Sequence, residues 1–206
     1  MGPAVNAVVS AVVSKVKRRT VVIVASAVVA CLAIGLAVAF TGGSGKADDR
    51  QYVGASTSAW LYKAGHRPVA PGFSGKTLTG AALSSASYKG KVVVLNFWGS
   101  WCGPCRGEAQ TLAALSAKYT KTGVSFVGDD VGDTPLNAQT FAKSMGVTYP
   151  SLNDPGYQVA QDFGTAVLIN DTPTTLVLDR TGHIAGVIYG AAEYSVLNTM
   201  LKDVSA

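Results

Sequence analysis

Residues 92–105 have the sequence VVVLNFWGSWCGPC, an apolar run that leads directly into two cysteines, Cys102 and Cys105. A near-continuous apolar run predicts a strand that is buried on both faces. We expect a helix to begin at about Gly103, so that Cys102 lies where free backbone N–H groups and the helix dipole stabilise a thiolate. Cys105 follows one turn later and can close a disulfide. The pattern is typical of dithiol–disulfide exchange.

Two other uses of the cysteine pair are open at this point. A structural zinc site needs about four ligands, and the sequence adds only Cys31, in a separate apolar segment, and the histidines His66 and His183. A structural disulfide usually closes a long loop, because a long loop removes more entropy from the unfolded chain. The pattern therefore favours redox chemistry over a structural bridge or a metal site. We expect no metal and no cofactor besides the dithiol.

The N-terminal part of the chain predicts a membrane segment. Val21–Phe40 is a run of 20 residues without a charge, and a helix of that length spans about 30 Å, the thickness of a bilayer core. Basic residues stay on the cytoplasmic side, so the rest of the chain should face outward. We expect a transmembrane or signal-anchor helix at 20–40 and a cytoplasmic segment at 1–19, whose basic residues are Lys15, Lys17, Arg18 and Arg19.

Two other fates of this segment are compatible with the sequence. Ala37-Val38-Ala39 offers a small-residue cleavage site, as in a secretory signal peptide. Val28-Val29-Ala30-Cys31 resembles a lipoprotein box in which Cys31 would carry the lipid. The favoured expectation is a single-pass protein of the cell membrane; the alternatives are a secreted protein and a lipoprotein. All three place the C-terminal part on the extracytoplasmic side.

The charge of the chain supports this topology. The net charge is +5, but four of the 17 basic residues precede the apolar run, and the other 13 are balanced by 12 acids. The basic excess therefore indicates membrane orientation and not a nucleic-acid surface. The outward part holds only Cys102 and Cys105, and a disulfide between them would persist in an oxidising exterior.

Beyond a glycine-rich linker at 41–64, residues 65–206 predict one α/β domain. Strands alternate with helices and are followed by a hairpin and a last helix, which indicates a mixed central sheet flanked by helices. The expected elements are a hairpin at 76–83, strands at 92–97, 124–127, 149–152, 174–179 and 184–189, and helices at 103–119, 134–145, from Asp154-Pro155 to Phe163, and around Val196–Leu201.

Two landmarks carry a family resemblance. The stretch Gly90–Arg106 and the sequence Pro173-Thr174-Thr175 are similar to the TlpA/ResA-like branch of the thioredoxin superfamily, membrane-anchored thiol–disulfide oxidoreductases. The resemblance covers about 65–205 and implies a thioredoxin fold with an N-terminal hairpin and a central insertion at Asp133–Gly164. The chain departs from the family in two places. Gln110 stands where the family usually has proline, and the stretch Thr165–Asp171, expected to border the client groove, is longer than usual.

The residues of the first landmark have distinct expected roles. Cys102, expected to be exposed, attacks a client disulfide, and Cys105 resolves the mixed disulfide. Glu108 lies one turn beyond Cys105 and could take its proton; the alternative is an exposed acid near a helix start. The resemblance carries Glu108 over as a functional residue. Asn96 replaces the buried acid of thioredoxins, and we expect it to bond buried backbone groups.

The second landmark implies a client-binding segment. Pro173 matches the cis-proline of the family, and a cis bond there would let Thr172 offer its N–H and C=O to an extended client. Trp101 is expected to contact clients, whereas Trp98 is expected in the core.

Together these features predict an extracytoplasmic reductase of protein disulfides. Gly103-Pro104 resembles the spacer of reducing thioredoxins. The resemblance implies apocytochrome c as client, whose haem-site cysteines must be reduced, and a membrane thiol carrier of the CcdA/DsbD type as electron source. We expect a monomer that binds no nucleic acid. The alternatives are a disulfide-forming oxidant or general redox protein, a thiol peroxidase, and a copper-binding module.

Overall fold

The computed structural model describes residues 49–55, 58–169 and 171–206. These residues belong to one compact unit, Asp49–Ala206. The predictions for 1–19 and 20–40 fall outside the described residues. Within the described ranges, no helix is both long and apolar enough to cross a bilayer.

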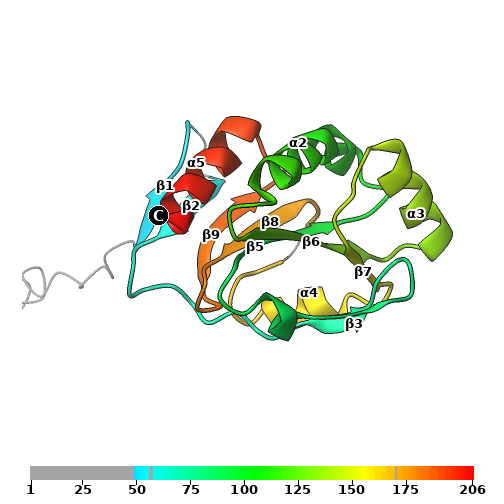
Figure 1. The fold of residues 1–206 in the computed structure, drawn as a ribbon, viewed down its shortest axis with the longest axis horizontal. Coiled ribbons are helices and arrows are strands. Elements are labelled where there is room, and N and C mark those ends of the chain that lie inside the picture. The colour runs from blue at the N-terminus through cyan, green and yellow to red at the C-terminus, as the bar shows by residue number, and fades with distance from the viewer. Residues whose placement is uncertain (1–48, 56–57, 170) are drawn as a thin grey trace, which may run out of the picture. The chain divides into compact units, whose positions relative to one another are not determined.

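A seven-stranded mixed sheet forms the centre of the domain (Figure 1). The β5–β6 and β6–β7 pairs are parallel and the other pairs are antiparallel. All seven residues of β5 are buried, as the apolar run predicts. In their order across the sheet, the strands are β1 (Arg50–Tyr52), β2 (Ala59–Tyr62), β9 (Ile184–Tyr189), β8 (Thr174–Leu178), β5 (Val92–Trp98), β6 (Val124–Val131) and β7 (Ser151–Asp154).

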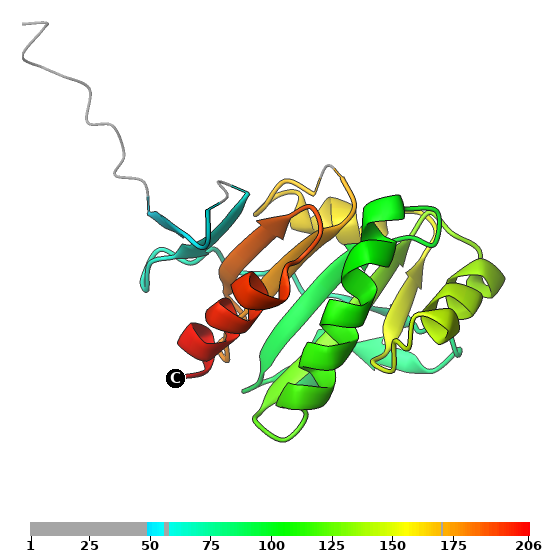
Figure 2. The same cartoon turned by 90° about the horizontal axis from the view of Figure 1, so that it is seen from above.

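Helices and a small hairpin cover the two faces of the sheet. Helix α2 (Gly103–Tyr119) lies over the central strands with α5 (Tyr194–Ser205) beside it, and α3 (Pro135–Ser144) lies near the β7 edge (Figure 2). The opposite face is covered by α4 (Gln158–Phe163) and by the hairpin and short helix β3 (Ser74–Lys76), β4 (Ala82–Ser84) and η1 (Ser85–Tyr88) (Figure 1). This arrangement is the thioredoxin-like α/β fold that the resemblance implies.

Apolar clusters fill both layers. Leu112 and Leu115 of α2 meet Leu197 and Met200 of α5 on one face. On the other face Phe163 of α4 packs with residues of β5 and of the hairpin. A third cluster contains both cysteines with Trp98, Ala109, Ala138 and Phe141. The site therefore lies where β5, α2 and α3 meet.

The expected linker at 41–64 extends too far. Residues of β1 and β2 form a hairpin that pairs with β9, and Trp60 and Leu61 are only 6% exposed. The hairpin was missed because its two strands have three and four residues, too few for a period-2 pattern to be recognised.

Two other boundaries differ from the predictions. Helix α4 begins at Gln158 and not at Pro155, because the carboxylate of Asp154 caps the helix from outside, accepting the N–H groups of Gln158 at 2.8 Å and Val159 at 2.9 Å. Strand β6 continues to Val131, four residues beyond the apolar run. Helix α2 is continuous through Gln110.

Candidate functional site

Cys102 and Cys105 form a disulfide at the start of α2, with their Cα atoms 5.3 Å apart. Strand β5 ends at Trp98, and Cys102 is the N-cap residue of α2. Its Sγ accepts the backbone N–H of Cys105 at 3.1 Å. A sulfur at this position meets the positive end of the helix dipole, which favours the thiolate once the disulfide is opened.

The expected exposure of Cys102 is wrong for the disulfide form. Cys102 is 4% exposed and Cys105 is 2% exposed. Both cysteines are buried because they are bonded to each other and pack in the cluster that contains Trp98 and Phe141.

The two tryptophans have the expected, different environments. Trp98 is buried and stacks on Phe141, with ring centroids 5.0 Å apart. Trp101 is 57% exposed, and its Nε1–H donates to the carbonyl of Val131 at 3.3 Å. The indole of Trp101 is therefore held in place beside the disulfide while much of it remains exposed.

The side chain of Glu108, in α2, is buried, and each of its two carboxylate oxygens accepts a hydrogen bond. Its Oε1 accepts the side-chain amide of Asn96 at 2.7 Å, and its Oε2 accepts the backbone N–H of Ala192 at 2.7 Å. The same amide also donates to Oγ1 of Thr175 at 3.0 Å. The expectation that Asn96 bonds backbone groups is therefore wrong: its described partners are two side chains.

The environment of Glu108 suits proton transfer near neutral pH. Burial raises the pKa of its carboxyl to about 7, although the hydrogen bonds from Ala192 and Asn96 act in the opposite direction. Glu108 is 2% exposed, which excludes the alternative of an exposed acid near the helix start. It lies one helical turn beyond Cys105, so the two side chains share a face of α2.

The Thr172–Pro173 peptide bond is cis, as the resemblance implies. The backbone N–H of Thr172, which we expected to bind a client, donates here to the Asp171 carboxylate at 2.8 Å. Asp171 is the last residue of the longer loop.

Two small pockets flank this segment, and both include Asp171 and Thr172. One, of about 180 Å³, lies toward Trp101 and Tyr157. The other, of about 360 Å³, lies toward Leu168 and Tyr189. Residues of the longer loop therefore line both pockets. The Tyr189 hydroxyl donates to the carbonyl of Leu168 in this loop at 2.8 Å.

The sequence analysis missed two buried acids on β6. Asp129 and Asp130 are both 0% exposed. Burial, with nearby acids, raises the pKa of each to about 8; the main neighbour is Asp154 for Asp129 and Asp133 for Asp130. The signal was present as two consecutive acids one residue beyond the predicted strand at 124–127.

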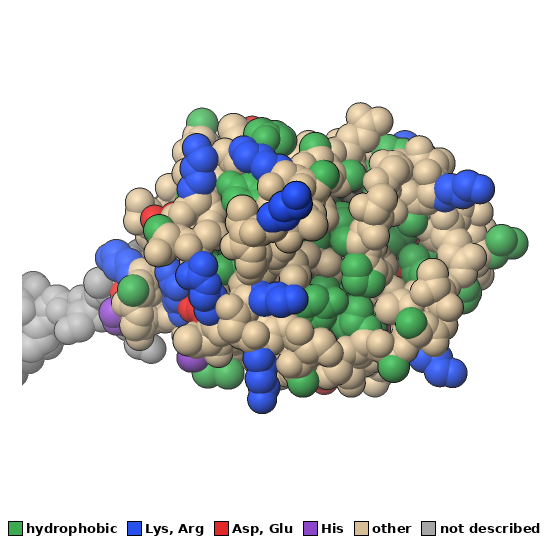
Figure 3. Space-filling view, viewed as in Figure 1, with side chains coloured by type: hydrophobic (Ala, Val, Ile, Leu, Met, Phe, Trp, Pro, Cys, Tyr) green, Lys and Arg blue, Asp and Glu red, His purple; other side chains and the backbone are tan. Residues whose placement is uncertain are grey.

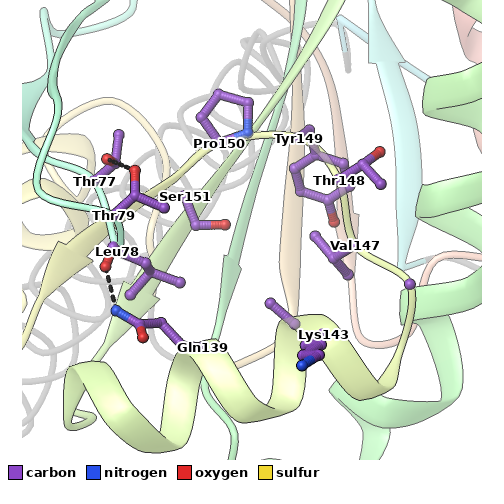
Figure 4. A pocket seen from close by; sticks show the side chains of 12 residues that line it. Thr77, Leu78, Thr79, Gln139, Lys143, Val147, Thr148, Tyr149, Pro150 and Ser151 are labelled. Atoms are coloured by element: carbon purple, nitrogen blue, oxygen red, sulfur yellow. Dashed lines mark hydrogen bonds between the residues drawn. The ribbon is translucent and has the colours of Figure 1, made fainter.

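A further cavity among the described residues lies away from the disulfide. Its volume is about 770 Å³, and it lies between the β3–β4 loop, α3 and the segment before β7 (Figure 4). The side-chain amide of Gln139 donates to the carbonyl of Leu78 across it. Leu78, Ala142 and Val147 line the cavity and also pack against the cysteine cluster, so the cavity adjoins the site but does not contain the sulfurs.

The described part of the chain shows no cluster of metal ligands. It contains no group of three or more His, Cys, Asp or Glu side chains arranged to hold a metal ion. Lys and Arg side chains on the face shown in Figure 3 are spread singly or in small groups.

The comparisons agree with this site. The AhpC/TSA family model matches residues 67–187. A thiol-disulfide oxidoreductase ResA of Geobacillus thermodenitrificans is 37% identical over 136 residues, 66% of this chain and 76% of that protein. A DsbF homologue from Corynebacterium diphtheriae has a TM-score of 0.66 and 34% identity, covering 75% of this chain and 98% of that chain.

A thioredoxin family thiol:disulfide interchange protein from Chlorobium tepidum has a TM-score of 0.63 and 31% identity, covering 68% of this chain and 97% of that chain. The family model spans more than half of this chain, over the segment that holds Cys102, Cys105 and Pro173. The chain therefore belongs to the AhpC/TSA family of thioredoxin-fold proteins and, within it, to the ResA-like thiol–disulfide oxidoreductases.

Proposed function

We propose that this oxidoreductase works as a reductase of protein disulfides on the extracytoplasmic side of the cell membrane. The observation that carries the proposal is the buried Glu108, hydrogen-bonded to Asn96 and Ala192, one turn beyond the second cysteine of the pair. The carboxylate of Glu108 accepts the proton of the Cys105 thiol, which must ionise before it can attack the mixed disulfide.

The reaction proceeds in two exchanges. The Cys102 thiolate attacks one sulfur of the client disulfide, forms a mixed disulfide and releases the other client sulfur as a thiolate, which takes a proton from water. Cys105 then loses its proton to Glu108 and attacks Cys102, which re-forms the Cys102–Cys105 disulfide and frees the second client sulfur. Two electrons pass to the client, and no other cofactor is needed.

The reducing direction is supported by modest stabilisation of the thiolate. In the described part of the chain, Cys102 Sγ accepts one hydrogen bond, from Cys105. The nearby cation Arg106 is directed at the Phe141 ring, with its guanidinium carbon 5.0 Å from the ring centroid. A strong oxidant instead requires its reduced form to be strongly stabilised.

The client and the electron source follow from the resemblance to the ResA-like branch. We propose apocytochrome c, reduced at its haem-site cysteines, as client, and a membrane thiol carrier of the CcdA/DsbD type as electron source. The uncharged run Val21–Phe40 would anchor the domain to the membrane.

Two measurements test the proposal. Equilibration of the full chain with glutathione or thioredoxin buffers should give a potential near the reducing end of the thioredoxin range, about −270 mV, and a value near −120 mV would reverse the direction. Replacing Cys105→Ser in the host should trap clients on Cys102. Cytochrome c precursors among the trapped proteins are expected, and a broad set of secreted proteins without them would contradict that client.

A further inference from the structure

The backbone N–H of Thr172, the hydrogen-bond donor that a client strand would use, already has an acceptor in this protein. An extended client pairs with the residue before the cis-proline through backbone hydrogen bonds. Here the Asp171 carboxylate accepts the Thr172 N–H at 2.8 Å. A client carbonyl can take this N–H only if the exposed Asp171 carboxylate moves away, and the carboxylate is then free to meet a cation of the client.

The adjoining pocket offers space for one client side chain. Its volume of about 180 Å³ is enclosed by aromatic and aliphatic groups that include Phe97, Trp101, Tyr157 and Ile169. Tyr157 has a left-handed backbone, with φ of 59°. Its phenol oxygen occupies the space beside Gly132, only 2.1 Å from where a Cβ there would lie. The lack of a side chain at this glycine therefore lets the Tyr157 ring form one wall.

Among the described residues that line the two pockets, the one charged side chain is acidic. Asp171 lines both pockets, and no Lys or Arg is among the described residues that line either of them. A second carboxylate, Asp133, accepts the N–H of Ser100 at 2.8 Å, directly before Trp101 in the chain. Aromatic walls beside a carboxylate favour a cation on a long aliphatic stem and disfavour another carboxylate.

We propose that this groove selects client segments with a lysine or arginine close to the target cysteine. The client backbone carbonyl replaces Asp171 on the Thr172 N–H, the basic side chain enters the pocket of Trp101 and Tyr157, and its cation meets the released carboxylate. The inference rests on the proposed attack of Cys102 on protein disulfides and names the class of client that the site prefers.

Short peptides with one cysteine blocked as a mixed disulfide with thionitrobenzoate test this inference. The reduced full chain attacks the peptide sulfur and releases coloured thionitrobenzoate. Cys105 then frees the peptide thiol, so that one enzyme dithiol is oxidised for each peptide disulfide reduced. The second-order rate constant of this single turnover is taken as kcat/KM. Lysine, leucine or glutamate is placed at each of two positions on either side of the cysteine.

At one position the lysine peptide should have a kcat/KM about tenfold above that of the glutamate peptide, as expected for one ion pair with a cation–π contact. Asp171→Asn keeps an oxygen for the Thr172 N–H but removes the charge, and should reduce the ratio to about threefold or less. Tyr157→Ala should slow the lysine peptide more than the glutamate peptide, whereas Tyr157→Phe should retain the wild-type preference.

The matched control is Asp162→Asn, which removes an exposed acid of α4 that lines neither pocket. It should leave the ratio unchanged. Equal kcat/KM for the lysine and glutamate peptides at all four positions would overturn the inference, as would a lysine-to-glutamate ratio that Asp171→Asn does not lower. Insulin reduction by the same preparation would then still support the proposed function. If neither insulin nor any peptide is reduced, the proposed function fails and the inference fails with it.

Discussion

Glu108 shows how a single side chain can connect three segments of the chain. Its two oxygens accept N–H groups from Asn96 on β5 and Ala192 before α5, while its backbone belongs to α2. Burial nevertheless keeps its pKa at about 7. Near neutral pH the carboxyl therefore exists in both protonation states, as a group that exchanges protons with a thiol requires.

We predict that Glu108→Gln removes the base for the second exchange. In the wild type the ionised carboxylate is present above about pH 7, so client release should rise with pH through this value and then level off. The variant should lose this step and release client roughly 100-fold more slowly at pH 8. Stopped-flow reduction of insulin across pH 5.5–9 would measure both profiles.

The control for this substitution is Glu193→Gln, which changes an exposed glutamate that does not cap α5 with its side chain. It should retain the wild-type profile. Glu108→Gln also places an NH₂ group opposite a donor and should cost about 1–3 kcal/mol of stability, so its folding is checked by circular dichroism. Identical pH profiles for wild type and Glu108→Gln would reject the role of this base.

Because Asp130 is buried and its pKa is raised, we predict that the free energy of unfolding decreases as the pH rises. Its pKa is about 8 in the folded state and about 3.9 in an unfolded chain. Between these values the unfolded state holds fewer protons, so stability decreases as pH rises from about 4 to 8 and then levels off. Asp130→Asn should match the wild type at pH 4 and be more stable at pH 8, by about 1 kcal/mol or more.

Urea unfolding at pH 4.5, 6 and 8 measures this difference. The exposed Asp203 provides the matched control, since Asp203→Asn removes the same charge at the surface. A constant difference between Asp130→Asn and wild type at all three pH values would contradict the argument.

At the scale of elements, the end of β5 and the start of α2 carry most of the chemistry. Strand β5 is central in the sheet, between β6 and β8, so its position is fixed on both sides. The chain then turns over residues 99–101 and begins α2 at Gly103. A rigid strand that leads into a helix places both sulfurs at the helix N-terminus. The turn between the strand and the helix is held by the bonds of Ser100 to Asp133 and of Trp101 to Val131.

The β1–β2 hairpin leads to a prediction about the domain boundary. Ala59, Trp60 and Leu61 are buried against β9 and its neighbours. A chain that starts at residue 65 loses these contacts and exposes the edge of β9, whereas a chain that starts at residue 49 keeps them. The shorter chain should be less stable by at least about 3–5 kcal/mol, the cost of removing one large buried side chain.

Urea unfolding of the two shortened chains beside the full chain would measure this cost. The chain from residue 49 is the control, since it keeps all seven strands of the sheet. Equal midpoints for the two shortened chains would show that β1 and β2 contribute nothing to stability.

The disulfide and the two pockets beside Thr172 are assembled from distant segments of the chain. The disulfide comes from α2, Thr172 and Pro173 precede β8, and Tyr157 precedes α4. Because the sheet fixes these elements, the redox state of the Cys102–Cys105 pair and the free energy of unfolding of the domain are linked.

This linkage predicts the effect of oxidation on stability. In a reductase, folding favours the disulfide form over the dithiol form, whereas a strong oxidant stabilises its reduced form. The oxidised full chain should therefore unfold at a higher urea concentration than the reduced chain. Greater stability of the reduced chain would contradict the reducing direction, and a Cys102→Ser, Cys105→Ser variant that lacks the disulfide serves as the control for effects of the reductant.

Much of the local structure follows from short-range patterns. The strand that becomes β5, the span of α2, the cysteine pair and the segment around Pro173 were all predicted, because each depends on residues that are neighbours along the chain. Helix α4 shows the limit of such patterns: Asp154-Pro155 resembled a helix start, but the carboxylate caps N–H groups four and five residues away.

Other features depend on contacts between residues far apart in the chain. The bond of Glu108 to Ala192 joins residues 84 positions apart, and the burial of Asp129 and Asp130 follows from the strands and helices packed around β6. Apolar periodicity indicates which face of an element is buried but not which polar groups meet there. The dithiol could therefore be recognised from the chain alone, whereas the hydrogen-bond partners of Glu108 and the walls of the pockets beside Thr172 became visible only after the elements were packed together.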